Sequence, residues 1–265
     1  FIETQNPTIN YFNQILPARS VKVYVDFFPV SKTNLKINKI YISLGELNYT
    51  QLNSFSELIK PSNFKNILNN KINKINLTSE IEIFLDKNGG IKNYIIRGQV
   101  ADLQANLFKN IILKNTNLNF FADKEDILIK NIYGKIDDIE INNGDIKLNL
   151  ESGTKLKSNF ATNIDLDSEK IKKFNELLKE FNLKGNFQEL VGNFSNNISV
   201  NFDKTYKVTN YNYSLSGDLK KSKIELFQTI KNNFNIKEIK EIFLLDTQVD
   251  LNLSEKNFKL GINGK

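Results

Sequence analysis

The fold is decided by residues 91–150, which read IKNYIIRGQVADLQANLFKNIILKNTNLNFFADKEDILIKNIYGKIDDIEINNGDIKLNL. This stretch contains twice the pattern apolar-x-Gly-x-apolar-x-x-apolar, centred on Gly98 and Gly134, and the pattern recurs around Gly185 and Gly217. In a strand, the first three positions point to one face, where a glycine relieves crowding or permits a bulge. A unit this small cannot bury its own apolar face, so its repetition predicts strands stacked into something long.

Turn signals between the alternating segments favour a β-meander. The sequence Asp86-Lys87-Asn88-Gly89-Gly90 separates alternating apolar residues at 75–85 from those at 94–100. Asn143-Gly144 separates a second pair of alternating runs, and Asn-Gly supplies the two positive φ angles of a type I′ turn. We expect a hairpin turn at each place.

Helical spacing interrupts the strand pattern in a few segments. A helix is predicted from Ser62 to Ile72 and a clearer one from Ser168 to Phe181, each with a single apolar stripe. Residues up to Pro17 read as a loop or short helix, and residues 224–245 suit either a strand or a helix. The predicted fold is mainly β, an elongated and curved antiparallel β-groove of meander repeats with two or three amphipathic helices.

Residues 1–265 form one elongated repeat-type β fragment of a larger protein in this interpretation, with a possible hinge at 166–185. The chain starts at Phe1 and contains no methionine, which suggests a fragment or processed form. No run of about 18 apolar residues exists, so we expect any membrane anchor to lie outside these boundaries.

Cysteine and histidine are both absent, and this excludes many chemistries. Disulfides, thiol nucleophiles, Ser-His-Asp triads, histidine acid-base catalysis and the usual zinc sites all need one of the two. The densest acidic cluster is Asp137, Asp138 and Glu140, which we interpret as solvated positions and a turn flank of a strand, with a carboxylate-pair glycosidase as the nearest enzymatic alternative. We therefore expect no enzymatic activity, no cofactor and no metal site.

The formal net charge of +6 does not indicate nucleic-acid binding. The basic residues are lysines except for Arg19 and Arg97, whereas readers of bases and phosphates rely on arginine forks. We expect no nucleic-acid partner. A mild positive field would favour anionic lipid head groups.

The chain resembles the AsmA-like superfamily of bacterial envelope proteins, and most closely its YhdP and TamB branches. The resemblance is carried by long alternating strands and by units such as Ile96-Arg97-Gly98-Gln99-Val100-Ala101-Asp102-Leu103. It implies a periplasmic protein, anchored in the inner membrane in its full length, whose repeated β-groove moves phospholipid between the inner and outer membranes. It also implies a possible outer-membrane protein partner.

A sheet with one apolar face must cover that face with a second layer or with another apolar material, and acyl chains qualify. The alternative is a structural or adhesive β-sandwich or β-helix module whose inward residues pack against each other without a lipid ligand. The residues predicted to line a groove and to bind phospholipid acyl chains share the alternating phase of neighbouring strands: Ile81, Ile83, Tyr94, Ile96, Val100, Ile132, Ile136, Ile146 and Leu148.

Overall fold

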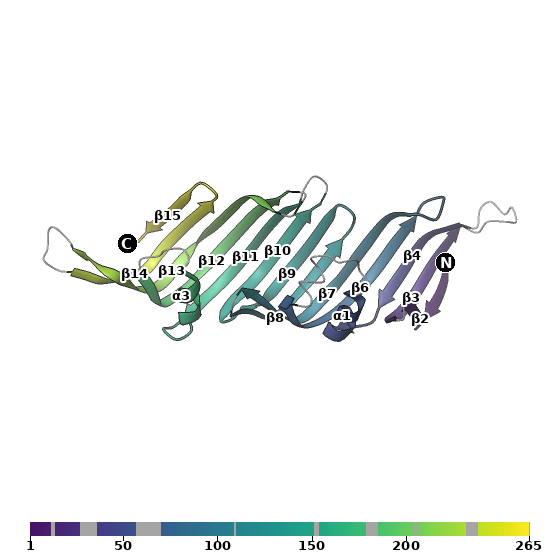
Figure 1. Ribbon diagram of the computed structural model, residues 1–265, viewed down its shortest axis with the longest axis horizontal. Helices are drawn as coiled ribbons and strands as arrows, with labels where there is room; N and C mark the ends of the chain where they lie inside the picture. The colour runs from purple at the N-terminus through teal and green to yellow at the C-terminus, as the bar shows by residue number, and fades with distance from the viewer. Residues whose placement is uncertain are drawn as a thin grey trace.

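In the computed structural model, the described residues form one long, open, antiparallel β-sheet of fifteen strands (Figure 1). Almost every strand pairs with the strands before and after it in the sequence, so the sheet is a meander. The mainly β, antiparallel fold predicted from the alternation is confirmed. The structure describes residues 1–11, 14–26, 36–56, 70–108, 110–150, 154–178, 185–203, 205, 207–231 and 238–264.

The elements follow one another in a simple order. They are β1 (Ile2–Gln5), β2 (Thr8–Tyr11), β3 (Gln14–Asp26), β4 (Lys36–Leu44), β5 (Leu47–Asn48), α1 (Tyr49–Ser56), β6 (Ile72–Leu85), β7 (Ile91–Phe108), β8 (Ile111–Ala122), β9 (Asp126–Ile136), β10 (Ile139–Asn149), β11 (Lys155–Leu166), α3 (Lys172–Leu178), β12 (Gly185–Phe202), β13 (Val208–Lys231), β14 (Glu238–Ser254) and β15 (Phe258–Asn263).

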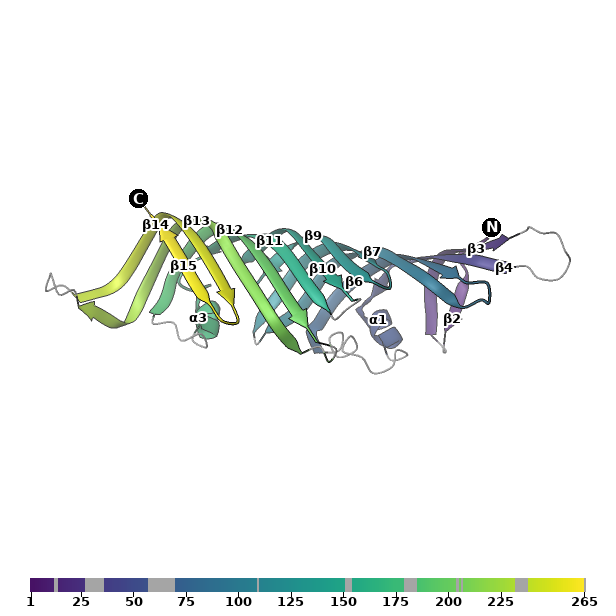
Figure 2. The same ribbon diagram turned by 90° about the horizontal axis from the view of Figure 1, so that it is seen from above.

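The sheet is arched, and both α1 and α3 lie on its concave side (Figure 2). We call this side the inner face and the opposite side the outer face. Leu52 of α1 packs on the cluster of Ala18, Leu44 and Leu47, and Ile81 packs against the same cluster. Ile81 and the residues that share its face therefore point inward.

Bulges in the middle of the strands account for the arch. Four neighbouring strands, β7 to β10, each contain one Asn or Asp residue with a left-handed backbone, and the pairing register shifts beside it. A bulge bends its strand and increases the local twist, so bulges side by side bend the sheet along a common line. The four residues are Asp102, Asn115, Asn131 and Asn143.

The motif glycines mark places where neighbouring strands leave no space for a side chain. A Cβ added to Gly98 would clash with the carbonyl oxygen of Thr78 and with the ring of Phe120, and one added to Gly217 would clash with the carbonyl oxygen of Asn193. The prediction that these glycines relieve crowding is confirmed.

One of the two predicted hairpin turns is confirmed and the other is wrong. At 86–90 the carboxylate of Asp86 accepts hydrogen bonds from the backbone N–H groups of Asn88 (2.8 Å) and Gly90 (2.9 Å), which closes the turn between β6 and β7. Asn143-Gly144 lies inside β10, where Asn143 (φ 51°) makes a bulge instead of a turn. The hairpin between β9 and β10 turns at Asp137 (φ 49°), because Ile136 pairs directly with Ile139.

The other local predictions have mixed outcomes. The segment before Pro17 forms strands β1 and β2 and the start of β3, so its assignment as a loop or short helix is wrong; each strand pairs with β3, and this long-range pairing outweighs the weak local pattern. Residues 224–231 and 238–245 are strand. Most of the helix predicted from Ser62 lies outside the described residues, and the one from Ser168 is present as α3, which starts at Lys172.

Candidate functional site

An apolar row crosses the inner face from strand to strand. Its members are direct partners in the pairing register, so their side chains lie side by side on one face. The row runs through nine consecutive neighbouring strands from β3 to β12, and its residues are Val21, Ile42, Ile81, Ile96, Ala122, Ile127, Leu148, Leu156 and Val200.

A second row runs beside the first, offset from it by two residues on each of the strands β8 to β12. It contains aromatic and aliphatic side chains with one serine, and it reaches the last strand of the sheet. Its residues are Phe120, Ile129, Ile146, Ser158, Ile198, Tyr213, Leu253 and Phe258. The inner face is therefore a broad apolar band and not a single line of side chains.

All nine residues predicted to line a groove lie on the inner face. Ile81, Ile96 and Leu148 belong to the first row, and Ile146 belongs to the second. Ile83 pairs with Tyr94 beside the first row. Val100 pairs with Leu77 and Leu118, and Ile136 with Leu113 and Ile139. Ile132 lies beside Gly144, where an added Cβ would touch the Cβ of Ile132.

The inner-face side chains are only partly shielded from solvent. Of the nine, Val100 is buried (8% exposed) and the other eight are half-buried. Side chains in a filled core resemble Leu166 and Ile171, which are 1% and 2% exposed. Within the described residues, most of the band has neighbours on its own sheet but no second layer above it.

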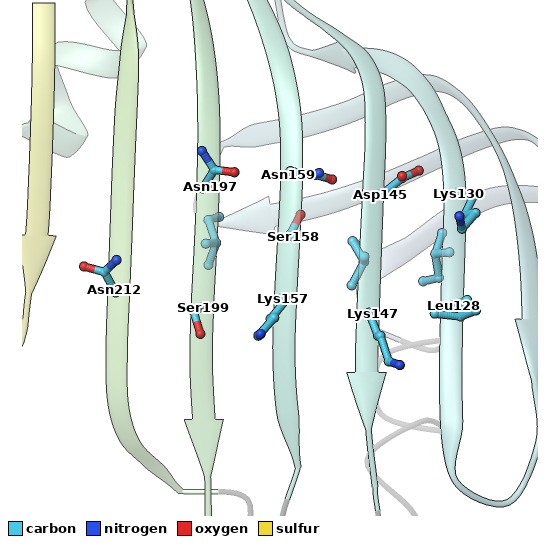
Figure 3. Close-up of a pocket in the computed structure, with 13 residues that line it drawn as sticks. Leu128, Lys130, Asp145, Lys147, Lys157, Ser158, Asn159, Asn197, Ser199 and Asn212 are labelled. Atoms are coloured by element: carbon cyan, nitrogen blue, oxygen red, sulfur yellow. The ribbon is translucent and has the colours of Figure 1, made fainter.

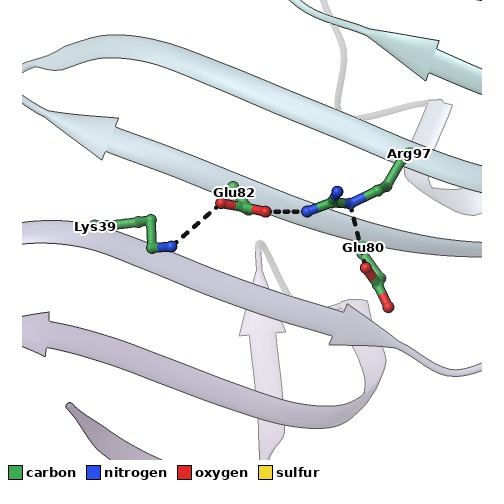
Figure 4. A network of polar contacts seen from close by, with 4 residues as sticks. All are labelled: Lys39, Glu80, Glu82 and Arg97. Atoms are coloured by element: carbon green, nitrogen blue, oxygen red, sulfur yellow. Dashed lines mark hydrogen bonds and ion pairs between the residues drawn. The ribbon is translucent and has the colours of Figure 1, made fainter.

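The outer face carries charge on the same strands. Glu82 accepts hydrogen bonds from Lys39 (Nζ to Oε2, 3.3 Å) and from the guanidinium of Arg97, whose Nε lies 3.3 Å from Oε2 of Glu80 (Figure 4). Exposed pairs of this kind contribute little stability. These pairs show that charged residues on the outer face alternate with the inner apolar residues along β4, β6 and β7.

A shallow hollow of about 450 Å³ lies over β9 to β13, and it is lined by polar residues together with Leu128, Ile129, Ile146 and Ile198. Two outer-face rows flank it, one from Leu128 to Asn212 and the other from Lys130 to Asn197 (Figure 3). The row between them also contributes, through Ile129, Ile146, Ser158 and Ile198. The hollow therefore overlaps only four residues of the second apolar row, and the rest of the apolar band lies outside it.

One polar cluster interrupts the apolar band, and no sequence pattern predicted it. The side chain of Asn196 is 4% exposed; its Nδ2 donates to Oγ1 of Thr162 (3.1 Å) and its Oδ1 accepts from the hydroxyl of Tyr213 (2.8 Å). Burial raises the pKa of Tyr213. Because these groups satisfy one another, the cluster fixes β11, β12 and β13 in register without leaving an unpaired polar atom among the three residues.

The prediction that Asp137 is solvated is wrong. Its side chain is 2% exposed; the carboxylate lies 3.5 Å from Nζ of Lys114 and 3.4 Å from Nζ of Lys173, and it accepts a hydrogen bond from the backbone N–H of Ile112 (3.4 Å). A buried carboxylate needs such partners. Asp138 is exposed and Glu140 is half-buried beside Lys135, so the three carboxylates do not converge on a site.

Helix α3 is attached to the sheet by specific polar contacts. Lys173 reaches Asp137 of the β9–β10 hairpin, and the side-chain amide of Asn175 bonds both the carbonyl (2.6 Å) and the N–H (3.0 Å) of Phe187 in β12. The residues of β12 near Phe187 extend beyond the end of β11, which stops opposite Leu190. Asn175 therefore replaces a neighbouring strand and protects this edge.

Several inner-face residues were missed by the sequence prediction. Leu156 and Val200 alternate with polar residues as the predicted ones do, whereas Ala122 and Ile127 each have an apolar neighbour, Phe121 and Leu128, that obscures the pattern. They were left out because the row in which they lie depends on the strand register, which the bulges shift.

Within the described residues, the fold and the site define a class of protein: an open antiparallel sheet with charged residues on its outer face and an apolar inner face, most of which has no second layer above it. Comparisons with protein-family models, curated proteins and solved structures find no match to this chain. Within the described ranges, no helix is long and apolar enough to cross a membrane. In the same ranges, no three Asp or Glu side chains gather as metal ligands.

Proposed function

We propose that the inner face is a groove that binds the acyl chains of phospholipids, and that the chain is a non-enzymatic lipid-binding and transfer module. The observation that supports this most is the part of the apolar row through Ile96, Ile127 and Leu148, whose members are half-buried and have no second layer above them within the described residues. A flexible acyl chain can cover such a band without specific polar contacts.

The energy of the contact is adequate for binding. Burying an acyl chain contributes about 0.8 kcal/mol for each CH₂ group, so shielding half of a long chain is enough for useful affinity. Two parallel rows give the band a width that suits more than one acyl chain. The band also continues over many strands, so a bound lipid can move along it without crossing a charged row.

The resemblance to AsmA-like envelope proteins extends the proposal to the whole protein. We infer a periplasmic location, an inner-membrane anchor outside residues 1–265, and movement of phospholipid between the inner and outer membranes, with an outer-membrane protein as a possible partner. The structural or adhesive module remains the competing function, since the same face could pack against another protein layer.

Adjacent residues of β9 provide a matched test of the binding site. Ile127 and Leu128 are both half-buried, but Ile127 belongs to the inner row and Leu128 pairs with Lys147 on the outer face. We expect Ile127→Asp to weaken the binding of a fluorescent phospholipid about tenfold or more, because a carboxylate would enter the apolar band. Leu128→Asp should leave binding unchanged, since its carboxylate would face a lysine.

The measurement is a fluorescence titration of the purified chain with the labelled phospholipid, with circular dichroism to confirm that both variants fold. Equal binding by the two variants would show that the inner face does not hold the probe. Loss of the fold in Ile127→Asp alone would indicate a core residue and favour the structural module. In that case, the same titration is carried out with Ile96→Ser, a milder substitution of another half-buried residue in the inner row.

A further inference from the structure

The hollow on the outer face over β9 to β13 is bounded by polar side chains that have no partners in the described part of the chain. Asn159, Asn197 and Asn212 line it from β11, β12 and β13, and all three are exposed (Figure 3). Their amide groups make no hydrogen bond there, whereas the amide of Asn196 on the inner face bonds to neighbouring side chains. Each free amide offers two donors and an acceptor oxygen, so the hollow has hydrogen-bonding capacity that the described residues do not use.

The charge of the lining is net positive. The hollow is lined by three lysines and one acidic residue, Asp145. Lys147 is held by Asp126 (Nζ to Oδ2, 2.9 Å), but Lys130 and Lys157 are exposed and form no ion pair within the described ranges. Two free ammonium groups beside free amides favour a ligand that carries anionic groups as well as hydrogen-bonding groups.

A second shallow hollow, of about 390 Å³, continues the first one over β3, β4, β6, β7 and β8. The two hollows share a flank, because Asn119 of the second pairs directly with Lys130 of the first. They also share a floor, because Phe120 pairs with Ile129. We call the two hollows together the outer trough. Neighbouring strands lie about 4.8 Å apart, so the part of the trough from β6 to β13 is on the order of 30 Å long, which suits an extended polymer.

The chemistry of the trough favours a polysaccharide over other extended polymers. The backbone groups of its floor are already paired within the sheet, so a peptide cannot add to them as a strand. Among the described residues that line the first hollow, none is an aromatic residue on which nucleic-acid bases could stack. Sugar hydroxyl groups donate and accept hydrogen bonds, as the free amides do, and acidic groups on the sugars would pair with the free lysines.

We propose that the outer trough binds a linear acidic polysaccharide that runs across the strands. Its hydroxyl groups bond to the amides of Asn159, Asn197 and Asn212, and its acidic groups lie beside Lys130 and Lys157. This binding is independent of the proposed lipid function, because the trough and the apolar band lie on opposite faces of the sheet. It is also independent of the strand edges, because the trough is formed by paired strands in the middle of the sheet.

Two asparagines of β12 provide a matched test. Asn197 lines the trough, whereas Asn193 lies on the same face outside the lining; both are exposed and make no side-chain hydrogen bond within the described residues. The two positions are about 13 Å apart along the strand, which exceeds the Debye length at 0.15 M salt. We expect Asn197→Asp to weaken binding about fivefold or more, since the carboxylate lacks the N–H donors and repels the acidic groups. Asn193→Asp should leave binding unchanged.

The probe is polygalacturonate, a linear polymer of an acidic sugar. Biolayer interferometry of the full 265-residue chain in 0.15 M salt measures its binding, with circular dichroism as the folding control. Dextran serves as a neutral polysaccharide and single-stranded DNA as a polyanion without sugar acids. We expect wild type to bind polygalacturonate more tightly than either, and Lys157→Gln to weaken that binding, since it removes one of the two free cations.

A wild-type chain that does not bind polygalacturonate overturns the proposal. Equal weakening by Asn197→Asp and Asn193→Asp also overturns it, because the trough would then not be the site. Dextran or single-stranded DNA that binds as tightly as polygalacturonate overturns the assignment to an acidic polysaccharide, since the trough would then select neither the charge nor the sugar.

Discussion

Gly98 illustrates how a single residue permits the packing of two neighbouring strands. Its inner side faces the carbonyl oxygen of Thr78 on β6 and the ring of Phe120 on β8. Any side chain would have to displace a backbone oxygen that cannot rotate away. The missing side chain therefore brings β6, β7 and β8 close together at this point of the arch.

Gly98→Val is expected to lower the free energy of unfolding by about 2–3 kcal/mol, because the added atoms overpack this position. Urea denaturation followed by circular dichroism measures the change. Gly264→Val is the matched control; its Cβ would lie 3.4 Å from Oγ1 of Thr247, so the effect should be much smaller. Equal losses in the two variants would contradict the close-packing account of Gly98.

Residue patterns predicted the alternation but not the bulges. Asn143-Gly144 has the sequence of a hairpin turn, yet only Asn143 adopts a positive φ, and β10 continues through it. The local sequence does not distinguish a hairpin turn from a bulge, because the pairing of β10 with β9 and β11 on either side decides which one forms. Burial of Asp137 was missed for the same reason, since Lys114 and Lys173 are distant in sequence.

Three turns at the ends of elements are closed by aspartate side chains. The backbone N–H of Asp126 lowers the pKa of Asp123, the backbone N–H of Lys170 lowers that of Asp167, and the hydroxyl of Thr205 lowers that of Asp203. Each of these hydrogen bonds favours the ionised carboxylate in the folded state.

Stability is therefore expected to fall in acid. A carboxyl whose folded pKa is below its ordinary value of 3.8 stabilises the fold above that pH, and the contribution is lost as the pH falls through the folded pKa. Replacing all three aspartates with asparagine keeps an oxygen acceptor at each turn but removes the titration. Thermal unfolding between pH 7 and pH 2 should show a smaller acid loss in the triple variant; an identical loss would contradict this prediction.

At the scale of elements, the sequence predicted strands better than helices. Strands were recognised because inner apolar and outer charged residues alternate over long segments, as in β6 and β7. Helix α3 begins later than its apolar spacing indicated, since Asp167 closes a turn before Lys172 through bonds to the N–H groups of Glu169 and Lys170. Helix α1 was not predicted; Asn48 caps it by accepting from the N–H of Gln51.

For the whole molecule, the nine predicted residues share a face because the bulges lie in neighbouring strands, so paired residues stay on the same face although the register shifts at each bulge. The extent of the apolar band could not be predicted, since each bulge shifts the partner of every later residue in its strand. The combination of an uncovered apolar band, a charged outer face and no second layer within the described residues is the basis of the proposed lipid function.

Native mass spectrometry of the purified 265-residue chain tests the central claim most directly. A groove that holds acyl chains predicts protein peaks with added masses equal to one or more phospholipids from the expression host, present for wild type and Leu128→Asp and diminished for Ile127→Asp. Wild-type protein that carries no lipid mass, and acquires none after incubation with phospholipid vesicles, would contradict the account.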